Sequence, residues 1–204
     1  MNVEISAQVV KKLRDKTGAG MMNCKQALLE NSGNFDKAIE SLRLKGMATA
    51  DKKASRSTNE GMIYSYIHTG NKLGILVEVS CETDFVAKRP EFIDLTKNIA
   101  MQLASNSDIE FVNSSDISET VKDKIWNFES AKDDLSNKPE EIQQKIIQGR
   151  VEKSLNTKVL LKQDYIRNSN ITVEEFIKQT IGLLGENIKV TRFVRYVFGE
   201  LDEE

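Results

Sequence analysis

The stretch that decides the fold class is M-I-Y-S-Y-I-H-T-G-N-K-L-G-I-L-V-E-V-S, residues 62–80. Two runs of β-branched and aromatic residues, 62–68 and 73–80, flank the turn-forming residues 69–72. This pattern predicts a β-hairpin. In the second run apolar residues occupy alternate positions, so one face of the strand is expected in the core and the other half exposed. The positions expected in the core are Ile75, Val77 and Val79.

A further strand is expected near the end of the chain, where residues 187–200 read N-I-K-V-T-R-F-V-R-Y-V-F-G-E. Ile188 and Val190 fall on one face of this strand. A change of phase, such as a β-bulge produces, is needed to reach Phe193 and Val197. The strand would pair with the hairpin and complete a sheet of at least three strands.

Residues 1–46 predict three short helices that form a head of their own, because apolar residues at three-and-four spacing lie between capping residues and glycines. The expected helices begin at Ser6, Asn23 and Asn34 and end at Gly18, Asn31 and Gly46. Helices of this length bury little apolar surface. The head is therefore predicted to be a recognition module rather than an enzyme scaffold.

Residues 47–60 carry no apolar periodicity and are rich in charged and small residues. They predict a linker, or an extension of the third helix. A domain boundary is placed there, so that residues 61–204 form the second domain.

The second domain is expected to contain four helices besides its strands. Pro90 can open the first of them, which continues with apolar residues at helical spacing. Residues 116–134 and 139–155 predict two amphipathic helices, and Thr172 with Glu175 forms the capping box of the last. The fold class is predicted as α+β, with a small antiparallel sheet packed by helices.

The charge balance argues against unspecific binding of nucleic acid. The net charge is −2, from 29 basic and 31 acidic residues, whereas such binders need a clear basic excess. Residues 1–60 carry 11 Lys and Arg against 7 Asp and Glu, so the head is mildly basic and the rest acidic. A protein partner with an acidic face suits this distribution. No apolar run spans a bilayer and no targeting signal is recognisable, so neither membrane insertion nor secretion is expected.

The chain is poor in residues that catalyse covalent chemistry. Its cysteines are Cys24 and Cys81, its one histidine is His68, and no C-x-x-C spacing for zinc occurs. Cys81 and His68 stand at the far ends of the hairpin strands, too far apart for a thiol and its base. Glu82 and Asp84 could start a metal site, but no further ligand follows, so a solvated loop is favoured. We expect no enzyme, no cofactor and no metal.

The glycine-rich segment T-G-A-G-M-M-N-C-K, residues 17–25, does not satisfy the pattern of a phosphate-binding loop. A helix precedes it, and the Walker and dinucleotide spacings are missing. Met21 and Met22 are adjacent in the helix that follows, where neighbours point about 100° apart. At least one methionine is expected at the surface as an adaptable contact residue; in the alternative both fill the small core of the head.

A second unusual stretch, C-E-T-D-F-V-A-K-R-P-E-F at residues 81–92, joins the end of the hairpin to the helix opened by Pro90. It places the acidic Asp84 beside the aromatic Phe85. Either this is an ordinary corner of the core, or the aromatic ring is meant for another protein.

The one tryptophan, Trp126, lies with Ile125 and Phe128 in the predicted helix 116–134. The charges around it are mixed rather than basic. A core or a subunit interface is therefore favoured over stacking on nucleic-acid bases.

Four segments, in order along the chain, resemble the translation elongation factor Ts family. They cover the head, the corner after the hairpin, one predicted helix and the last strand. The segments are K-L-R-D-K-T-G-A-G-M-M-N-C-K-Q-A-L (12–28), E-T-D-F-V-A-K (82–88), G-R-V-E-K-S-L (149–155) and G-E-N-I-K-V-T-R-F-V-R-Y (185–196).

The resemblance implies a guanine nucleotide exchange factor that binds the GDP-bound and nucleotide-free forms of the GTPase elongation factor Tu. It also implies a head of the ubiquitin-associated three-helix type and an α/β dimerisation domain. In the family, the T-D-F-V segment acts at the magnesium-binding region of the GTPase, and its aromatic ring pushes between two helices so that Mg²⁺ is displaced. The matching residues here are Thr83, Asp84, Phe85 and Val86. Docking of the head falls on Arg14, Met21 and Met22.

The sequence departs from its relatives at Asp164–Tyr165, where many have a Pro-Phe pair. Its length allows a single copy of the core, and the short members of the family form homodimers, so a homodimer is expected. The implied location is the bacterial cytoplasm or the plastid stroma, with no membrane or nucleic-acid partner. Two rival hypotheses remain: a small enzyme using Cys81 and a ribosome-associated RNA-binding protein.

Overall fold

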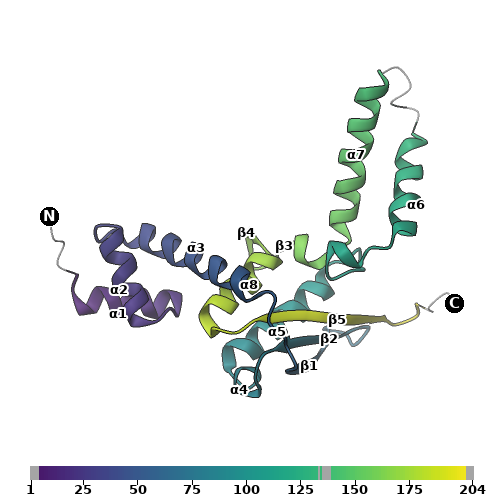
Figure 1. Ribbon diagram of the computed structural model, residues 1–204. Coiled ribbons are helices and arrows are strands. Elements are labelled where there is room, and N and C mark those ends of the chain that lie inside the picture. The colour runs from purple at the N-terminus through teal and green to yellow at the C-terminus, as the bar shows by residue number, and fades with distance from the viewer. Residues whose placement is uncertain (1–4, 133, 135–138, 201–204) are drawn as a thin grey trace. The chain divides into compact units, whose positions relative to one another are not determined.

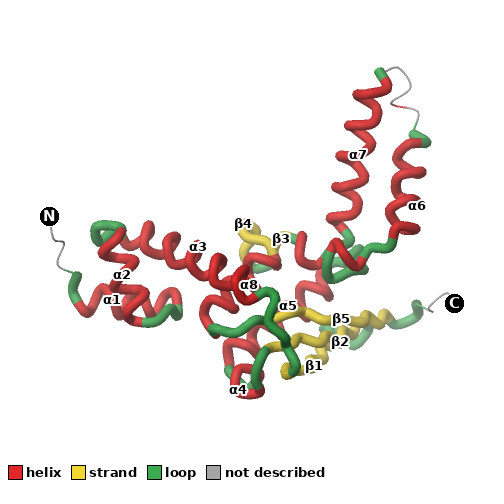
Figure 2. The backbone as a smooth tube through the Cα atoms, viewed as in Figure 1, coloured by secondary structure: helices red, strands yellow, loops and turns green. Residues whose placement is uncertain are grey.

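The structure, a computed structural model, describes residues 5–132, 134 and 139–200. Figures 1 and 2 show its helices and strands. The helices are α1 (Ala7–Thr17), α2 (Met21–Glu30), α3 (Phe35–Lys53), α4 (Asp84–Ala87), α5 (Pro90–Ser105), α6 (Glu119–Ser130), α7 (Glu140–Thr157) and α8 (Val173–Leu184), with short 3₁₀ turns η1 (Ser114–Asp116) and η3 (Leu160–Lys162). The strands are β1 (Glu60–Ile67), β2 (Leu73–Cys81), β3 (Asp164–Tyr165), β4 (Asn168–Thr172) and β5 (Ile188–Val197). The α+β class is confirmed.

The chain divides into two compact units, each built from separate segments. The first unit contains the described parts of 1–62, 80–95 and 175–189, and the second contains those of 63–79, 96–174 and 190–204. The three-helix head lies in the first unit, together with α4, most of α8 and the beginning of α5. The expected domain bounds 1–46, 47–60 and 61–204 stay a prediction.

The head has the three predicted helices, although α2 begins at Met21 rather than at Asn23 and its N-cap residue, Gly20, makes no side-chain hydrogen bond. The Ser6 hydroxyl accepts a hydrogen bond from the Val9 N–H at 3.4 Å, and Gly18 ends α1 with a left-handed φ of 68°. The Asn34 side chain accepts from the Lys37 N–H at 3.0 Å and caps α3. A small apolar core holds the helices together; its buried members are Val10, Leu13, Cys24, Ala27, Leu28 and Ala38.

Helix α3 does not end at the predicted Gly46 but continues to Lys53, so the alternative that residues 47–60 extend the third helix is confirmed for their first half. The reason is a contact between distant parts of the chain. A Cβ atom added to Gly182 of α8 would lie 2.7 Å from the Gly46 Cα atom, so the two glycines let α3 and α8 approach closely. An ion pair of 2.9 Å between Lys178 and Asp51 lies along the same contact. Packing against α8 thus offsets the cost of glycine in a helix interior, about 1 kcal/mol.

The larger sheet has the strand order β1-β2-β5, so the predicted hairpin and its third strand are confirmed. The three apolar residues expected in the core of β2 are each no more than 1% exposed. Along β5 the buried positions change phase between Val190 and Phe193, as the sequence predicts. The face of the sheet that carries the buried residues is covered, while the opposite face keeps exposed apolar side chains.

Helices α6 and α7 of the second unit form a hairpin of adjacent helices (Figure 1) held together by apolar residues that include Ile147 and Val151. A small hairpin, β3–β4, was not predicted. The departure at Asp164–Tyr165 lies in it, and the buried Gln102 side chain fixes it by bonding the Asp164 carbonyl and the Ile166 N–H. None of the described helices has the length and apolar character of a membrane span.

The glycine contact gives a matched pair of substitutions. Gly182→Ala would push a methyl group into the α3 backbone, and overpacking of this kind costs about 1–3 kcal/mol of unfolding free energy. Gly46→Ala meets its nearest atom at 3.8 Å, an ordinary contact, and gains helix propensity. Thermal unfolding followed by circular dichroism should show a lower Tm for Gly182→Ala alone. Equal effects of the two substitutions would contradict the close approach.

Candidate functional site

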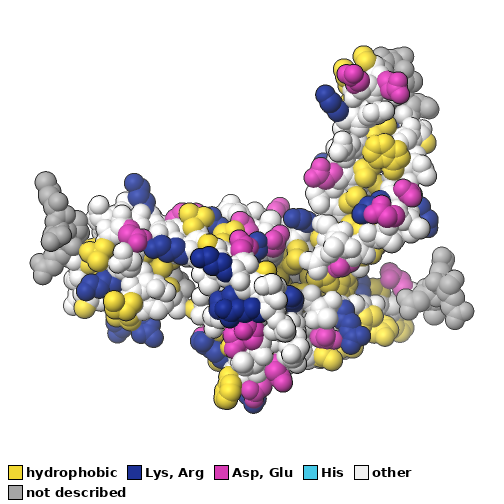
Figure 3. All heavy atoms as spheres, in the orientation of Figure 1, with side chains coloured by type: hydrophobic (Ala, Val, Ile, Leu, Met, Phe, Trp, Pro, Cys, Tyr) yellow, Lys and Arg dark blue, Asp and Glu magenta, His cyan; other side chains and the backbone are white. Residues whose placement is uncertain are grey.

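The corner between β2 and α4 presents Phe85 to solvent. Its side chain is 79% exposed, whereas the next residue, Val86, is only 6% exposed. Neighbours on a helix point about 100° apart, so the single turn of α4 buries Val86 and turns the aromatic ring outward. Figure 3 shows a hydrophobic side chain at the surface of the α4 region, bordered by charged ones. The alternative that Phe85 belongs to a core corner is therefore wrong.

Asp84 stands beside the ring and forms an ion pair with Lys88, one helical turn away, at 2.6 Å. The hydrogen bond from the Lys88 ammonium lowers the pKa of the Asp84 carboxyl. The side chains of Asp84 and Lys88 are both open to solvent, and a solvated position was expected for Asp84. The corner thus carries an ionised carboxylate next to an exposed aromatic ring.

Thr83 begins the corner and is held from the far end of α8. Its N–H and its hydroxyl donate to the two carboxylate oxygens of Glu186, at 2.9 and 2.6 Å. Gly185, with a left-handed φ of 79°, ends α8 just before this residue. The N-cap residue of α4 is thus fixed by a side chain that lies 103 positions away in the sequence.

Glu82 repeats this contact in the opposite direction. Its carboxylate accepts the N–H of Asn187 at 2.6 Å and meets the Arg56 guanidinium at 3.4 Å. The Asn187 N–H is the main cause that lowers the pKa of Glu82. Glu82 lies in the loop after β2, as expected, but its side chain is only 21% exposed because its carboxylate holds main chain. We call the four residues Glu82, Thr83, Glu186 and Asn187 the corner latch.

Cys81 closes β2 and is fully buried. Its thiol donates to the Thr83 carbonyl at 3.1 Å. Burial, with a smaller effect of the Glu186 carboxylate, raises the pKa of this thiol to about 11. His68 instead bonds the Tyr66 hydroxyl at 3.0 Å. Both partners support the interpretation of Cys81 as a structural residue rather than a nucleophile.

In the head, Met22 is 76% exposed and Met21 is 40% exposed. They open α2 directly after Gly20, the residue at its N-cap. Arg14 lies exposed in the last turn of α1, on the other side of the same connecting turn. The alternative that both methionines fill the core of the head is wrong, because Cys24, Ala27 and Leu28 do so. The role of the three exposed residues in docking stays a prediction.

Trp126 is 41% exposed and Phe128 is 67% exposed, so the expectation of a core position is wrong for both. Hydrophobic side chains are visible at the surface of the hairpin formed by α6 and α7 (Figure 3). A subunit interface there stays a prediction.

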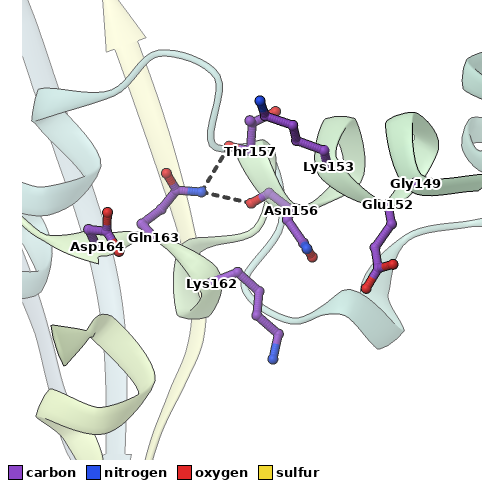
Figure 4. Close-up of a pocket in the computed structure, with 8 residues that line it drawn as sticks. All are labelled: Gly149, Glu152, Lys153, Asn156, Thr157, Lys162, Gln163 and Asp164. Carbon is purple, nitrogen blue, oxygen red and sulfur yellow. Dashed lines mark hydrogen bonds between the residues drawn. The ribbon is translucent and has the colours of Figure 1, made fainter. Parts of the chain in front are cut away.

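Among the described residues, hollows also occur away from the corner, and the following two gather no catalytic groups. A cavity of about 700 Å³ in the first unit lies between the head and α8, with Gly20, Arg43 and Leu183 in its lining. The other, of about 370 Å³, lies beside α7 and is drawn in Figure 4. There the Gln163 amide donates to the carbonyls of Asn156 and Thr157, both at 2.9 Å, and so serves the fold. Within the described residues, no cluster of three or more His, Cys, Asp or Glu could hold a metal ion.

The latch residues Glu186 and Asn187 were missed as part of the site. They appear in the sequence as G-E-N directly before the last strand, while Glu82 directly follows the second. Carboxylates next to the ends of strands and helices accept the main-chain N–H groups that these elements leave without a partner. An acidic residue at each of two neighbouring strand ends is the signal that could have revealed the latch.

Comparisons with known proteins agree over almost the whole chain. The family model described as Elongation factor TS matches residues 3–200. A relative from Phaeodactylum tricornutum, named Elongation factor Ts, chloroplastic, is 69% identical over 202 residues, which are 99% of this chain and 100% of the relative. A protein of the same name from Rhodomonas salina is 57% identical over 98% of this chain and 91% of its own. Elongation factor Ts of Rippkaea orientalis is 57% identical over 97% of this chain and 79% of its own.

The lowered pKa of Glu82 predicts a pH-dependent contribution to stability. A carboxyl whose pKa is lower in the folded state stabilises that state in full above its unfolded pKa, about 4.3. This contribution is lost as the pH falls through the lower folded value. Glu82→Gln should therefore lower the free energy of unfolding by about 1.5 kcal/mol at pH 7, the lower end of the range for a hydrogen bond to a charged group.

Urea unfolding at pH 7 and at pH 3 measures this difference, which should shrink at the lower pH. Glu152→Gln, an exposed substitution on α7, is the control. A deficit that is the same at both pH values would contradict the role of the ionised Glu82.

Proposed function

The chain belongs to the elongation factor Ts family, the nucleotide exchange factors of elongation factor Tu in translation elongation, and from this premise we propose how it acts: Phe85 displaces Mg²⁺ from the GTPase so that GDP is released. The family relationship supports elongation factor Tu as the partner and translation elongation as the process. The proposed displacement of Mg²⁺ rests on a single observation, which is that the Phe85 ring is exposed on a corner held by the corner latch.

The proposed step uses binding energy and breaks no covalent bond. Mg²⁺ bridges the phosphates to the GTPase and is the largest local positive charge, so its removal increases the repulsion that GDP meets. A factor that binds the nucleotide-free GTPase more tightly than the GDP form must weaken GDP binding by the same ratio. Thr83, Asp84 and Val86 act as the frame that aims Phe85, with Asp84 bringing a carboxylate toward the ion.

The ring alone is too weak for the whole effect. Burial of one aromatic side chain supplies about 1.5–3 kcal/mol, whereas a shift of about 10⁴-fold needs about 5.5 kcal/mol. Docking of the head through Arg14, Met21 and Met22 is proposed to add to it. The exposure of both methionines supports this role, since flexible sulfur-containing side chains adapt to a partner surface.

A second copy of the chain is proposed to supply the remaining contact. The open face of the larger sheet supports a homodimer, because side chains on alternate strand positions leave apolar surface uncovered there. Within the second unit these residues are Ile63 (66% exposed), Ile67 (60%), Leu76 (41%), Val194 (40%) and Tyr196 (63%). Trp126 on α6 is a further candidate for such an interface.

The proposal places the protein in the plastid stroma or in a bacterial cytoplasm, since relatives of both kinds carry the family name. The rival hypothesis of a thiol enzyme is disfavoured by the buried Cys81 with its raised pKa. The RNA-binding hypothesis is disfavoured by the acidic body.

Phe85→Ala should slow GDP release from elongation factor Tu about ten- to hundredfold, the equivalent of losing one buried aromatic side chain. The fold should persist because the ring is 79% exposed. Stopped-flow measurement with a fluorescent GDP analogue gives the rate. The control is Phe128→Ala, which removes another exposed ring, one that is 67% exposed on α6. Unchanged release by the Phe85 variant would remove this residue from its proposed role.

The homodimer is tested at the open sheet face. Leu76→Asp places a charge on the central strand of the open sheet face, where an unpaired charge buried by a second copy is costly, and should convert the dimer to a monomer. Sedimentation equilibrium measures the mass, and Leu44→Asp on α3, at a side chain that is 53% exposed, is the control. A wild-type chain that sediments as a monomer would sink the proposal.

A further inference from the structure

We infer that Asn187 is a positioning residue, which couples the helix carrying the head to the corner that carries Phe85. This inference rests on the proposed function and names the residue that would make its two contact regions act together. Asn187 is 2% exposed and lies between α8 and β5. Its hydrogen bonds run to the two other segments of the first unit, at Ala54 and Arg56 and at Glu82.

On one side Asn187 holds the end of α3. Its side-chain amide donates to the Arg56 carbonyl at 2.8 Å and to the Ala54 carbonyl at 3.3 Å. Ala54 is the C-cap residue of α3, so the amide satisfies main-chain groups where the helix ends. Beside it, the Lys53 ammonium donates to the Gly185 carbonyl at 2.5 Å. The end of α3 is thus tied to the residues just before β5.

On the other side Asn187 holds the corner. Its N–H donates to the Glu82 carboxylate at 2.6 Å, and its neighbour Glu186 accepts both donors of Thr83. Arg56, whose carbonyl accepts the Asn187 amide, also contacts the corner, because its guanidinium lies 3.4 Å from the same Glu82 carboxylate. We call these contacts among Asn187, Arg56 and Glu82 the circuit. Phe85 follows two residues after Thr83, within the single turn that this residue caps.

The head reaches Asn187 through α3 itself. The first half of this helix packs on α1 and α2 through the buried Ala38, and its end reaches the amide at Ala54. One continuous helix therefore connects the docking surface of the head to the latch. A rigid connection lets docking of the head deliver Phe85 already aimed, since prior ordering removes part of the entropic cost of binding.

Without the Asn187 amide, the head can still dock but the corner is no longer held to it. Asn187→Ala keeps the N–H that Glu82 needs and removes only the bonds to Ala54 and Arg56. The maximal rate of GDP release at saturating factor should fall roughly three- to tenfold, as expected when one or two side chains must be ordered again on binding. The half-saturating concentration should change less.

The decisive measurement is a double-mutant cycle in the full-length factor with elongation factor Tu bound to a fluorescent GDP analogue. If Asn187 acts through Phe85, then Asn187→Ala should add little once Phe85→Ala is present. Multiplicative effects on the maximal rate would overturn the coupling. A loss of folded protein would instead lower the active concentration, and the maximal rate would recover at higher concentration.

A matched control is Thr180→Val, which removes another buried hydrogen bond of the first unit, from the Thr180 hydroxyl to the Phe176 carbonyl at 3.1 Å. It should leave the maximal rate unchanged. If Asn187→Ala does not fold, Arg56→Ala tests the same circuit from its exposed side and should show the same non-additivity with Phe85→Ala. If Phe85→Ala alone has no effect, the proposed function fails; if it slows release and Asn187→Ala does not, only this inference fails.

Discussion

Two carboxylates hold together the corner that carries Phe85. Each of them accepts a main-chain N–H from the chain segment to which the other belongs. Glu186 takes the N–H of Thr83, and Glu82 takes that of Asn187. The helix between Thr83 and Lys88 has only four residues, far too few to be stable alone. Its exposed Phe85 adds no burial energy. Burial of Val86 contributes to fixing the corner, and charge-assisted hydrogen bonds from a distant segment are strong enough to add to it.

The residues that hold the corner and the residues proposed to bind the partner have opposite environments. Asn187 and Cys81 are buried and bonded to main chain, whereas Phe85 and Met22 are mostly exposed. A side chain that binds a partner contributes most to the free energy of binding when it is exposed in the unbound protein, because its apolar surface is then buried only in the complex. At the corner, hydrogen bonds of the neighbouring buried residues hold the main chain in place. The exposed sheet face follows the same logic if a second copy covers it.

Features set by local rules were predictable from the sequence, and features set by distant contacts were not. The caps at Ser6 and Asn34 and the β1–β2 hairpin depend on residues within a few positions, and each is confirmed. Gly46 illustrates the opposite case. A local rule marks it as a helix end, but Gly182 gives it another purpose, close packing of two helices. The latch was missed for the same reason, since its partners lie 103 and 105 positions apart. Motif resemblance identified the family and the exposed Phe85, but could not show what holds that residue in place.

The environment of Cys81 has a consequence for the chemical durability of the corner. With a pKa of about 11, the thiol is deprotonated in only about one molecule in a thousand at pH 8. Peroxides and electrophiles react with the thiolate, so this sulfur is a poor target for them. A corner closed by so unreactive a sulfur is expected to keep its shape in the presence of oxidants.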